Sequence, residues 1–363
     1  MKKLFMDCNA YRLRKSPSVT EGGMSRYMAM RNYLINNLNY KPISISGNRT
    51  ISAIQVIVFF LLHRNTRIFI MYPTNFFVMG SNSRVNRFLG DLAVKTFQIA
   101  SKHNMMVVDV ADLKYEQFID LEIPCDNLEL VRRREKKLFD SSAGFIFASA
   151  SMRDYAVRKY YLALSRCDVC NNGGREQSSN PAVDISEIAN HMSSKTINCV
   201  YAGTMNKGRM IDKMIDSFKE TPSARLYLMG PMGEWVEEYL ANNEIYNVYY
   251  LGEKDEETAH RIVCICDLGL IPYDENRLYY NIAYPTKLSF YLTAGIPYLA
   301  TPVKEVEMLH NENIGITGII SEWSTIINNL TEDQIFNMKR EIETKQEQYT
   351  WDYLLKRCRM INE

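Results

Sequence analysis

Short apolar runs alternate with longer stretches of helical periodicity along the whole chain. Residues 67–72 and 105–110 are almost continuously apolar, which is typical of strands covered on both faces of a sheet. The alternation predicts an α/β fold built on mostly parallel sheets. Strands are expected at residues 3–8, 67–72, 105–110, 144–148, 196–203, 224–229, 248–252, 267–273, 298–301 and 315–320.

The stretches between these runs predict helices. One of them, 50–63, contains the longest apolar run of the sequence, interrupted by Ser52 and Gln55. It is shorter than the roughly 18–20 residues of a membrane span, so a buried helix is expected. Other helices are expected near residues 25–38, 83–102, 126–139, 151–162, 209–218, 234–241, 256–264 and 286–294.

The composition shifts to Asn, Gly, Ser, Asp and Glu between residues 167 and 194, which predicts a domain boundary. We therefore expect a first domain at 1–175 and a second at 176–345. In the tail, 346–363, the apolar residues fall on one helical face, with Thr350 as candidate N-cap. A terminal apolar helix needs a partner surface, and this one is expected to pack on the first domain.

Overall composition limits the classes of function. The 363 residues are 46% hydrophobic and 23% charged, and the formal net charge of +1 gives no electrostatic case for nucleic acid. The eight cysteines are scattered, which favours reduced cytoplasmic thiols. Cys167 and Cys170 have metal-like spacing but no second pair, so no metal site is expected. The N-terminus is too short for a signal peptide and is expected to form a strand.

A tyrosine-rich segment followed by Pro285 and an apolar helix is the most distinctive part of the sequence. Lys287 falls in the first turn of this helix, where its charge opposes the positive end of the helix dipole. Such a position is unfavourable unless an anion joins the amine. The alternative is an exposed lysine whose amine reaches water.

Loops with glycine follow several expected strands, where anions collect at helix N-termini. Gly22 and Gly23 follow the first strand, and Lys207 lies in the loop after 196–203. Gly230 follows 224–229, and Tyr273 ends 267–273. Each loop is equally compatible with a simple turn. The dinucleotide fingerprint is absent, which argues against a nucleotide-dependent oxidoreductase.

Carboxylates and a basic run complete the candidate chemistry of the first half. Asp109 and Asp112 lie at the end of the strand 105–110, where they could act as general base or cap the next segment. Residues 132–137 contain five basic side chains. Such a run is typical of a solvated face, and the alternative is contact with anionic lipid.

With Tyr284, Lys287, the apolar helix and Gly295-Ile296-Pro297, the sequence resembles the GT-B glycosyltransferases. It is most similar to the bacterial group of β-1,6-galactofuranosyltransferases and adhesin glucosyltransferases. The resemblance implies two facing Rossmann-like domains and a C-terminal helix that crosses back to the first. Phe290 occupies the position of a glutamate in the larger retaining family, which favours the smaller group.

The resemblance also implies a site for a nucleotide sugar. Tyr284 and Lys287 would contact the diphosphate, and the segment with Lys207 would line the other side. The first domain would approach the nucleotide through its loop with Gly22 and Gly23. The expected nucleotide-binding residues are Thr20, Gly22, Gly23, Gly203, Thr204, Lys207, Gly230, Tyr273, Tyr284 and Lys287.

The expected function is transfer of a hexose, galactofuranose or glucose, from a UDP-sugar to a glycan or lipid-linked glycan acceptor in surface polysaccharide or glycoprotein synthesis. No metal or other cofactor is expected, because helix N-termini and basic side chains stabilise the leaving group in GT-B enzymes. The expected location is cytoplasmic, with peripheral membrane contact through the first domain and a homodimer left open. The alternative is a catalytically silent GT-B module that binds a partner glycosyltransferase or glycan.

Overall fold

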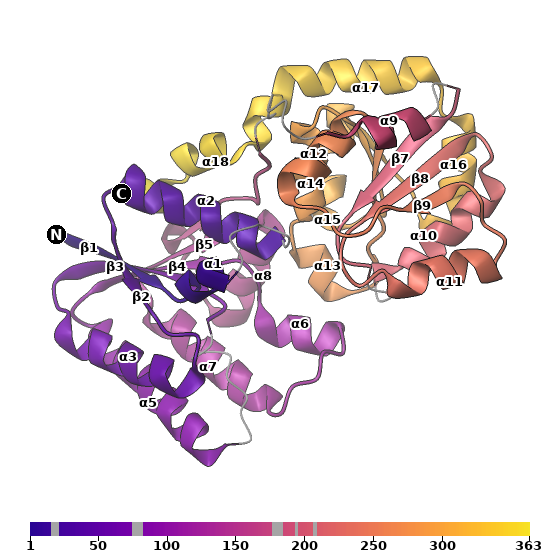
Figure 1. Cartoon of the computed structure of the whole chain (residues 1–363). Coiled ribbons are helices and arrows are strands. Elements are labelled where there is room, and N and C mark those ends of the chain that lie inside the picture. The colour runs from indigo at the N-terminus through magenta and orange to yellow at the C-terminus, as the bar shows by residue number, and fades with distance from the viewer. Residues whose placement is uncertain (16–21, 75–82, 176–183, 193–194, 206–208) are drawn as a thin grey trace. The chain divides into compact units, whose positions relative to one another are not determined.

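The computed structural model describes residues 1–15, 22–74, 83–175, 184–192, 195–205 and 209–363. Within them the chain forms two compact units (Figure 1). Residues 1–15, 23–171 and 355–363 belong to the first unit, and residues 172–354 make up most of the second. Each unit is built around one parallel sheet of six strands, as the alternating sequence pattern predicts.

The first unit has a sheet in the order β2-β1-β3-β4-β5-β6, in which every pair is parallel. All seven residues of β3 are buried, because parallel strands are covered by helices on both faces. Its strands are β1 (Lys2–Asp7), β2 (Lys41–Ser44), β3 (Thr66–Tyr72), β4 (Met105–Val110), β5 (Gly144–Phe147) and β6 (Cys167–Val169). Its helices are α1 (Ala10–Lys15), α2 (Gly22–Asn36), α3 (Arg49–Leu62), α5 (Arg84–Ala100), α6 (Lys114–Asp120), α7 (Leu128–Ser141), α8 (Ala150–Tyr160) and α19 (Arg359–Asn362), with the short 3₁₀ turn η1 (Leu164–Arg166).

The second unit repeats this architecture in the order β12-β11-β10-β7-β8-β9. Its strands are β7 (Ile197–Ala202), β8 (Ala224–Met229), β9 (Val248–Tyr250), β10 (Leu268–Ile271), β11 (Tyr298–Ala300) and β12 (Gly315–Thr317). Its helices are α9 (Ser186–His191), α10 (Ile211–Ser217), α11 (Glu234–Asn242), α12 (Glu256–Cys264), α13 (Leu278–Ile282), α14 (Thr286–Thr293), α15 (Lys304–Glu307), α16 (Trp323–Asn329) and α17 (Glu332–Lys345). The fully described 3₁₀ turns of this unit are η3 (Phe218–Glu220), η4 (His310–Glu312), η5 (Ile320–Glu322) and η6 (Gln346–Tyr349).

The segment 167–194 begins with β6, an edge strand of the first sheet. Two expectations about local structure need correction. The apolar helix α3 was expected to be buried, but one of its faces is exposed. The tail was expected to be one helix, but extended backbone at Thr350 and Cys358 divides it into η6, α18 (Trp351–Arg357) and α19.

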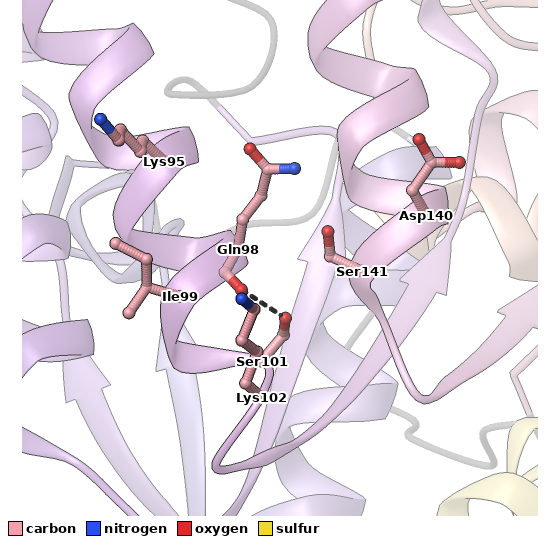
Figure 2. Close-up of a pocket in the computed structure, with 7 residues that line it drawn as sticks. All are labelled: Lys95, Gln98, Ile99, Ser101, Lys102, Asp140 and Ser141. Carbon is pink, nitrogen blue, oxygen red and sulfur yellow. Dashed lines mark hydrogen bonds between the residues drawn. The ribbon is translucent and has the colours of Figure 1, made fainter.

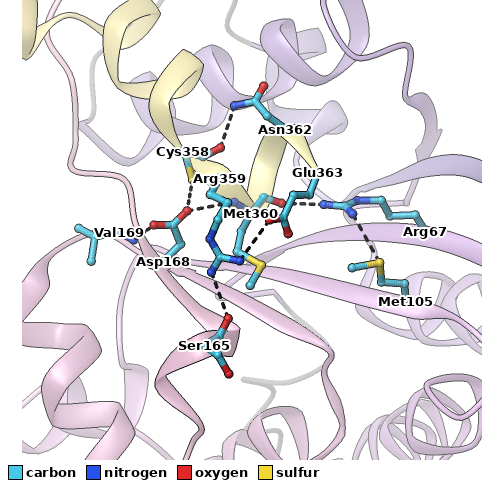
Figure 3. Close-up of polar contacts among 10 residues, drawn as sticks. All are labelled: Arg67, Met105, Ser165, Asp168, Val169, Cys358, Arg359, Met360, Asn362 and Glu363. Carbon is cyan, nitrogen blue, oxygen red and sulfur yellow. Dashed lines mark hydrogen bonds and ion pairs between the residues drawn. The ribbon is translucent and has the colours of Figure 1, made fainter.

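The last residues of the chain pack on the edge of the first sheet (Figure 3). Met360 donates its backbone N–H to the Asp168 carboxylate (3.0 Å) and accepts a hydrogen bond from Arg67 at its carbonyl oxygen (2.7 Å). Arg359 donates to the carbonyl oxygen of Ser165 (3.0 Å). These bonds attach α19 to β6 and β3, so the C-terminal segment is an integral part of the first unit.

Candidate functional site

The candidate site lies in the second unit, where the strand order of the sheet reverses. The chain moves outward from β7 through β8 to β9, then returns to β10 on the other side of β7. β7 and β10 are parallel neighbours, so their carboxyl ends lie side by side. Ligands of open α/β sheets bind at such a switch point.

Helix α14 is held against these strand ends by Tyr291. The ring of Tyr291 is fully buried, and its hydroxyl donates to the carbonyl oxygen of Leu270 in β10 (3.1 Å). The same hydroxyl accepts the backbone N–H of Ala202 in β7 (3.2 Å). Because Lys287 lies four residues earlier on α14, it is on the same face of the helix and points to the same strand ends.

Lys287 is only 5% exposed, which excludes the alternative that its amine reaches water. Its Nζ lies 3.4 Å from the Tyr273 hydroxyl, 4.7 Å from the ring centroid of Tyr201 and 5.3 Å from that of Tyr273. Aromatic faces attract a cation but do not neutralise it. In the described parts of the chain no carboxylate pairs with this ammonium group.

Arg209 adds a second cation to the same group of tyrosines. It precedes α10, and its guanidinium forms a side-chain hydrogen bond with Tyr280. Burial by itself lowers the pKa of Arg209, but electrostatic interaction with Tyr273, Tyr201, Tyr280 and Tyr279 raises it above its ordinary value. Burial raises the pKa of Tyr280 to about 12, against the opposing charge of Arg209. Arg209 is therefore charged and Tyr280 neutral near pH 7.

Stacking fixes the tyrosines around the two cations. The rings of Tyr273 and Tyr280 are stacked, with centroids 4.7 Å apart and planes inclined by 18°. The backbone of Tyr273 is fixed by Thr301, whose Oγ1 accepts its N–H (3.0 Å). Asp274, the next residue, pairs with Arg277 (3.1 Å) and so does not compensate Lys287.

Two glycines allow the backbone to come close to Lys287. A Cβ on Gly203 would lie 2.7 Å from both Cε and Nζ of Lys287. A Cβ on Gly230, where φ is +142°, would lie 2.0 Å from the carbonyl oxygen of Gly203. A side chain at position 203 would fill the space beside the amine, and one at position 230 would collide with the Gly203 backbone, which explains why glycine follows both β7 and β8.

The structure brings together part of the expected nucleotide-binding set. Gly203, Gly230, Tyr273 and Lys287 meet at the switch point, and the carbonyl oxygen of Thr204 accepts the Tyr201 hydroxyl (3.0 Å). Lys207 and Thr20 lie outside the described residues. Gly22 and Gly23 begin α2, but helix α1 lies between β1 and these glycines, so they do not directly follow the first strand as expected.

Tyr284 does not join this group. Its hydroxyl forms a hydrogen bond with Ser289 (2.8 Å) of α14. Burial raises the pKa of Tyr284, and the carboxylates of Glu305 and Glu312 raise it further despite the bond to Ser289. An acidic neighbourhood repels phosphate, so the structure does not support a contact of Tyr284 with a diphosphate.

Asp109 is fully buried, and both of its carboxylate oxygens accept hydrogen bonds from Arg26, at 2.5 and 3.0 Å. A general base must reach the proton that it removes, so this ion pair argues against a catalytic role for Asp109. Asp112 is partly exposed beyond the end of β4, and its assignment as a base stays a prediction.

Sequence reasoning missed Arg209, Tyr201 and Tyr280. Arg209 lies two residues after Lys207, so the position of this basic segment after a strand was a usable signal. Tyr201 lies inside an apolar strand run, and no spacing distinguishes it from the tyrosines that only pack. In the residues described, no group of three His, Cys, Asp or Glu side chains could hold a metal ion.

Comparison with known proteins gives a family match over the second half of the chain. Residues 199–360 match the sequence model of a family described as "Glucosyltransferase 3-like, C-terminal domain". No curated protein sequence matches the chain.

Several solved structures are similar to nearly the whole chain. HepE of Anabaena, in complex with UDP-glucose, has a TM-score of 0.65 and 14% identity, and the match covers 98% of this chain and 97% of that one. A glycosyltransferase from Rickettsia africae has a TM-score of 0.61 and 12% identity, with coverage of 98% and 96%. WaaG, a glycosyltransferase involved in lipopolysaccharide biosynthesis, has a TM-score of 0.58 and 13% identity, with coverage of 86% and 95%. These similarities show that the chain has the GT-B fold.

Proposed function

We propose that the chain is a glycosyltransferase that takes a hexose from a UDP-sugar. The observation that carries this proposal is the buried ammonium group of Lys287, which the described residues leave without a counter-ion beside the Arg209 guanidinium. Burying a charge is costly unless it is paired, so such a site favours a ligand that brings negative charge. A diphosphate supplies that charge.

The same two cations serve the transfer step. When the glycosidic bond of a UDP-sugar breaks, the bonding electrons go to the diphosphate oxygen and its negative charge grows. Lys287 and Arg209 are already in place to stabilise that charge, which is electrostatic preorganisation. We propose that this replaces a metal ion. The acceptor hydroxyl must lose a proton, and Asp112 is the proposed base.

Glucose is the first donor sugar to test, with galactofuranose as the second. The matching family is described as glucosyltransferase 3-like, and the structure of HepE contains UDP-glucose. We propose a glycan or lipid-linked glycan of the cell surface as acceptor. The similarity to WaaG, which is involved in lipopolysaccharide biosynthesis, supports this choice.

Calorimetric titration with UDP tests the proposal. We expect Lys287→Met to weaken UDP binding by roughly tenfold or more, the scale of one charge-assisted contact. The matched control is Lys339→Met, since Lys339 pairs with Asp267 (3.1 Å) before the opposite end of β10. The control should bind UDP like the unchanged protein. Absence of UDP binding by the unchanged protein would disprove the proposal.

One observation favours a second candidate, a catalytically silent GT-B module that binds a partner glycosyltransferase or glycan. The buried ion pair of Asp109 removes one of the two expected bases. Hydrolysis of UDP-glucose and UDP-galactofuranose separates the two candidates. Turnover that is lost in Asp112→Asn supports the enzyme, whereas intact UDP binding without turnover of any UDP-sugar supports the module.

A further inference from the structure

Helix α3 has apolar side chains on both of its faces. Ala53, Val56, Phe59 and Phe60 are buried against the first unit. The opposite face carries Ile51, Ile54, Val58, Leu61 and Leu62, which are between 46% and 73% exposed. A surface helix normally shows polar residues to water, so a helix that is apolar all round needs a further partner.

Helix α5 widens this apolar surface, because it lies beside α3 and runs in the same direction (Figure 1). Thr50 donates to the Asn86 side chain (2.9 Å) near the start of both helices, and the rings of Phe60 and Phe97 meet near their ends, with centroids 5.5 Å apart. The exposed apolar residues of α5 are Val85, Phe88 and Ile99. Together with the five of α3 they form what we call the α3–α5 face.

The charge around this face has one sign. Residues 22–90 contain no Asp or Glu but eight Lys and Arg, of which Arg26 and Arg67 are buried and Arg31 pairs with Asp7. Arg49 and Arg64 flank α3, and Arg84 and Arg87 begin α5. The first acidic residue beyond this segment, Asp91, is bound by Arg133 and Arg134, both at 3.1 Å. Basic residues therefore flank both ends of α3 and the start of α5.

A pocket of about 450 Å³ lies between the ends of α5 and α7 (Figure 2). Lys95 and Lys102 line it beside the exposed Ile99. Its acidic residue, Asp140, is paired with Lys136 (2.7 Å). The pocket therefore offers two lysines next to the apolar surface, a combination that suits an anionic group attached to an apolar chain.

We propose that the α3–α5 face docks on an anionic lipid membrane. Aliphatic side chains enter the boundary between head groups and acyl chains, while the surrounding Arg and Lys contact acidic head groups. A second copy of the chain fits less well, because it would bring the same basic residues against each other. In the described parts of the chain no helix could cross a membrane, so this contact is peripheral.

The face differs from the basic run 132–137 that the sequence suggested for lipid contact. Arg132, Arg133, Arg134 and Lys136 pair with Glu129, Asp91 and Asp140. These carboxylates neutralise much of the run. The α3–α5 face combines exposed aliphatic residues with basic residues that have no carboxylate partner among the described side chains.

Sedimentation of the full chain with vesicles tests the proposal. Vesicles of phosphatidylcholine alone are compared with vesicles that also contain phosphatidylglycerol, at low and high salt. We expect binding to the anionic vesicles that weakens with salt. The triple variant Ile54→Gln, Val58→Gln and Leu62→Gln should reduce this binding by roughly tenfold or more. These side chains are exposed, so the variant should fold.

The matched control places glutamine at two exposed aromatic residues of the second unit, Tyr246→Gln and Phe336→Gln. It should bind vesicles like the unchanged chain. UDP titration shows whether the triple variant is folded, and it separates this proposal from the nucleotide site, since each can fail alone. Absence of vesicle binding, equal binding to neutral vesicles or equal loss in the control would overturn the proposal. So would a dimer, seen by light scattering, that the triple variant abolishes.

Discussion

Buried charges at the carboxyl ends of the two sheets differ in whether they have a partner of opposite charge. In the first unit Asp109 accepts two hydrogen bonds from Arg26, and Asp7 accepts from Tyr27 (2.5 Å) and Arg31 (3.0 Å). In the second unit Lys287 and Arg209 face tyrosine rings and hydroxyls. The first sheet neutralises its charges internally, whereas the second keeps positive charge that its own described residues do not neutralise.

This difference separates structural charge from binding charge. In a buried ion pair each charge already has its partner, so the pair contributes to the fold and is not available to bind a ligand. A buried cation beside neutral hydroxyls has been desolvated without compensation, and a bound anion lowers its free energy. Residue type alone does not separate the two cases, because arginine occurs in both.

Arg26→Met tests the first half of this comparison and should have the largest effect. It leaves the Asp109 carboxylate buried and uncompensated, so we expect the free energy of unfolding to fall by about 3–5 kcal/mol. Urea unfolding of the intact chain measures the loss. The double variant Arg26→Met and Asp109→Leu removes both charges and should recover much of the stability. A double variant as unstable as the single one would contradict the pairing argument.

Acid should weaken the second unit, because it keeps a histidine neutral by burial. His260 in α12 packs its ring on Phe290 of α14, with centroids 5.3 Å apart. Burial, and then the charge of Arg175, lowers the pKa of His260 from 6.5 to about 4. A lowered histidine pKa gives stability that is complete above pH 6.5 and is lost as the pH falls toward 4.

The fall in the His260 pKa from 6.5 to about 4 corresponds to at most about 3.5 kcal/mol of stability. Unfolding measured at several pH values checks this prediction, with His260→Gln as the control. The variant cannot take up this proton, so its stability should fall less between pH 6.5 and 4. Equal pH dependence in both proteins would show that His260 is not the responsible group.

The sequence predicts the second sheet better than the first. All six strands of the second sheet appear near their expected positions, since each is a clear apolar run. The two strands missed in the first sheet, β2 and β6, are both at its edges. Edge strands are short and covered less completely, so Lys41–Ser44 and Cys167–Val169 lack the continuous apolar pattern.

For the candidate site, too, a residue could be predicted only where its signal is local in the sequence. Lys287 could be predicted, because its unfavourable place in the first turn of a helix is a local property. Arg209 and Tyr201 become partners of Lys287 only when β7 and β10 are neighbours, which is a property of the sheet order. The pairing of Asp109 with Arg26 spans 83 residues, so no local pattern showed that this carboxylate is occupied.

Glu129→Gln should have the smallest effect and completes the comparison, because it breaks an Arg–carboxylate pair that is exposed. Arg132 and Glu129 are 3.4 Å apart, with side chains 56% and 74% exposed. Water already solvates both groups, so breaking the pair itself costs little. The main stabilising effect that the variant loses is that of a negative charge in the first turn of α7, which interacts favourably with the helix dipole. We expect the free energy of unfolding to fall by about 0.5 kcal/mol, and by less at high salt. A loss as large as that of Arg26→Met would mean that burial does not decide the strength of these pairs, and the contrast between the two sheets would lose its basis.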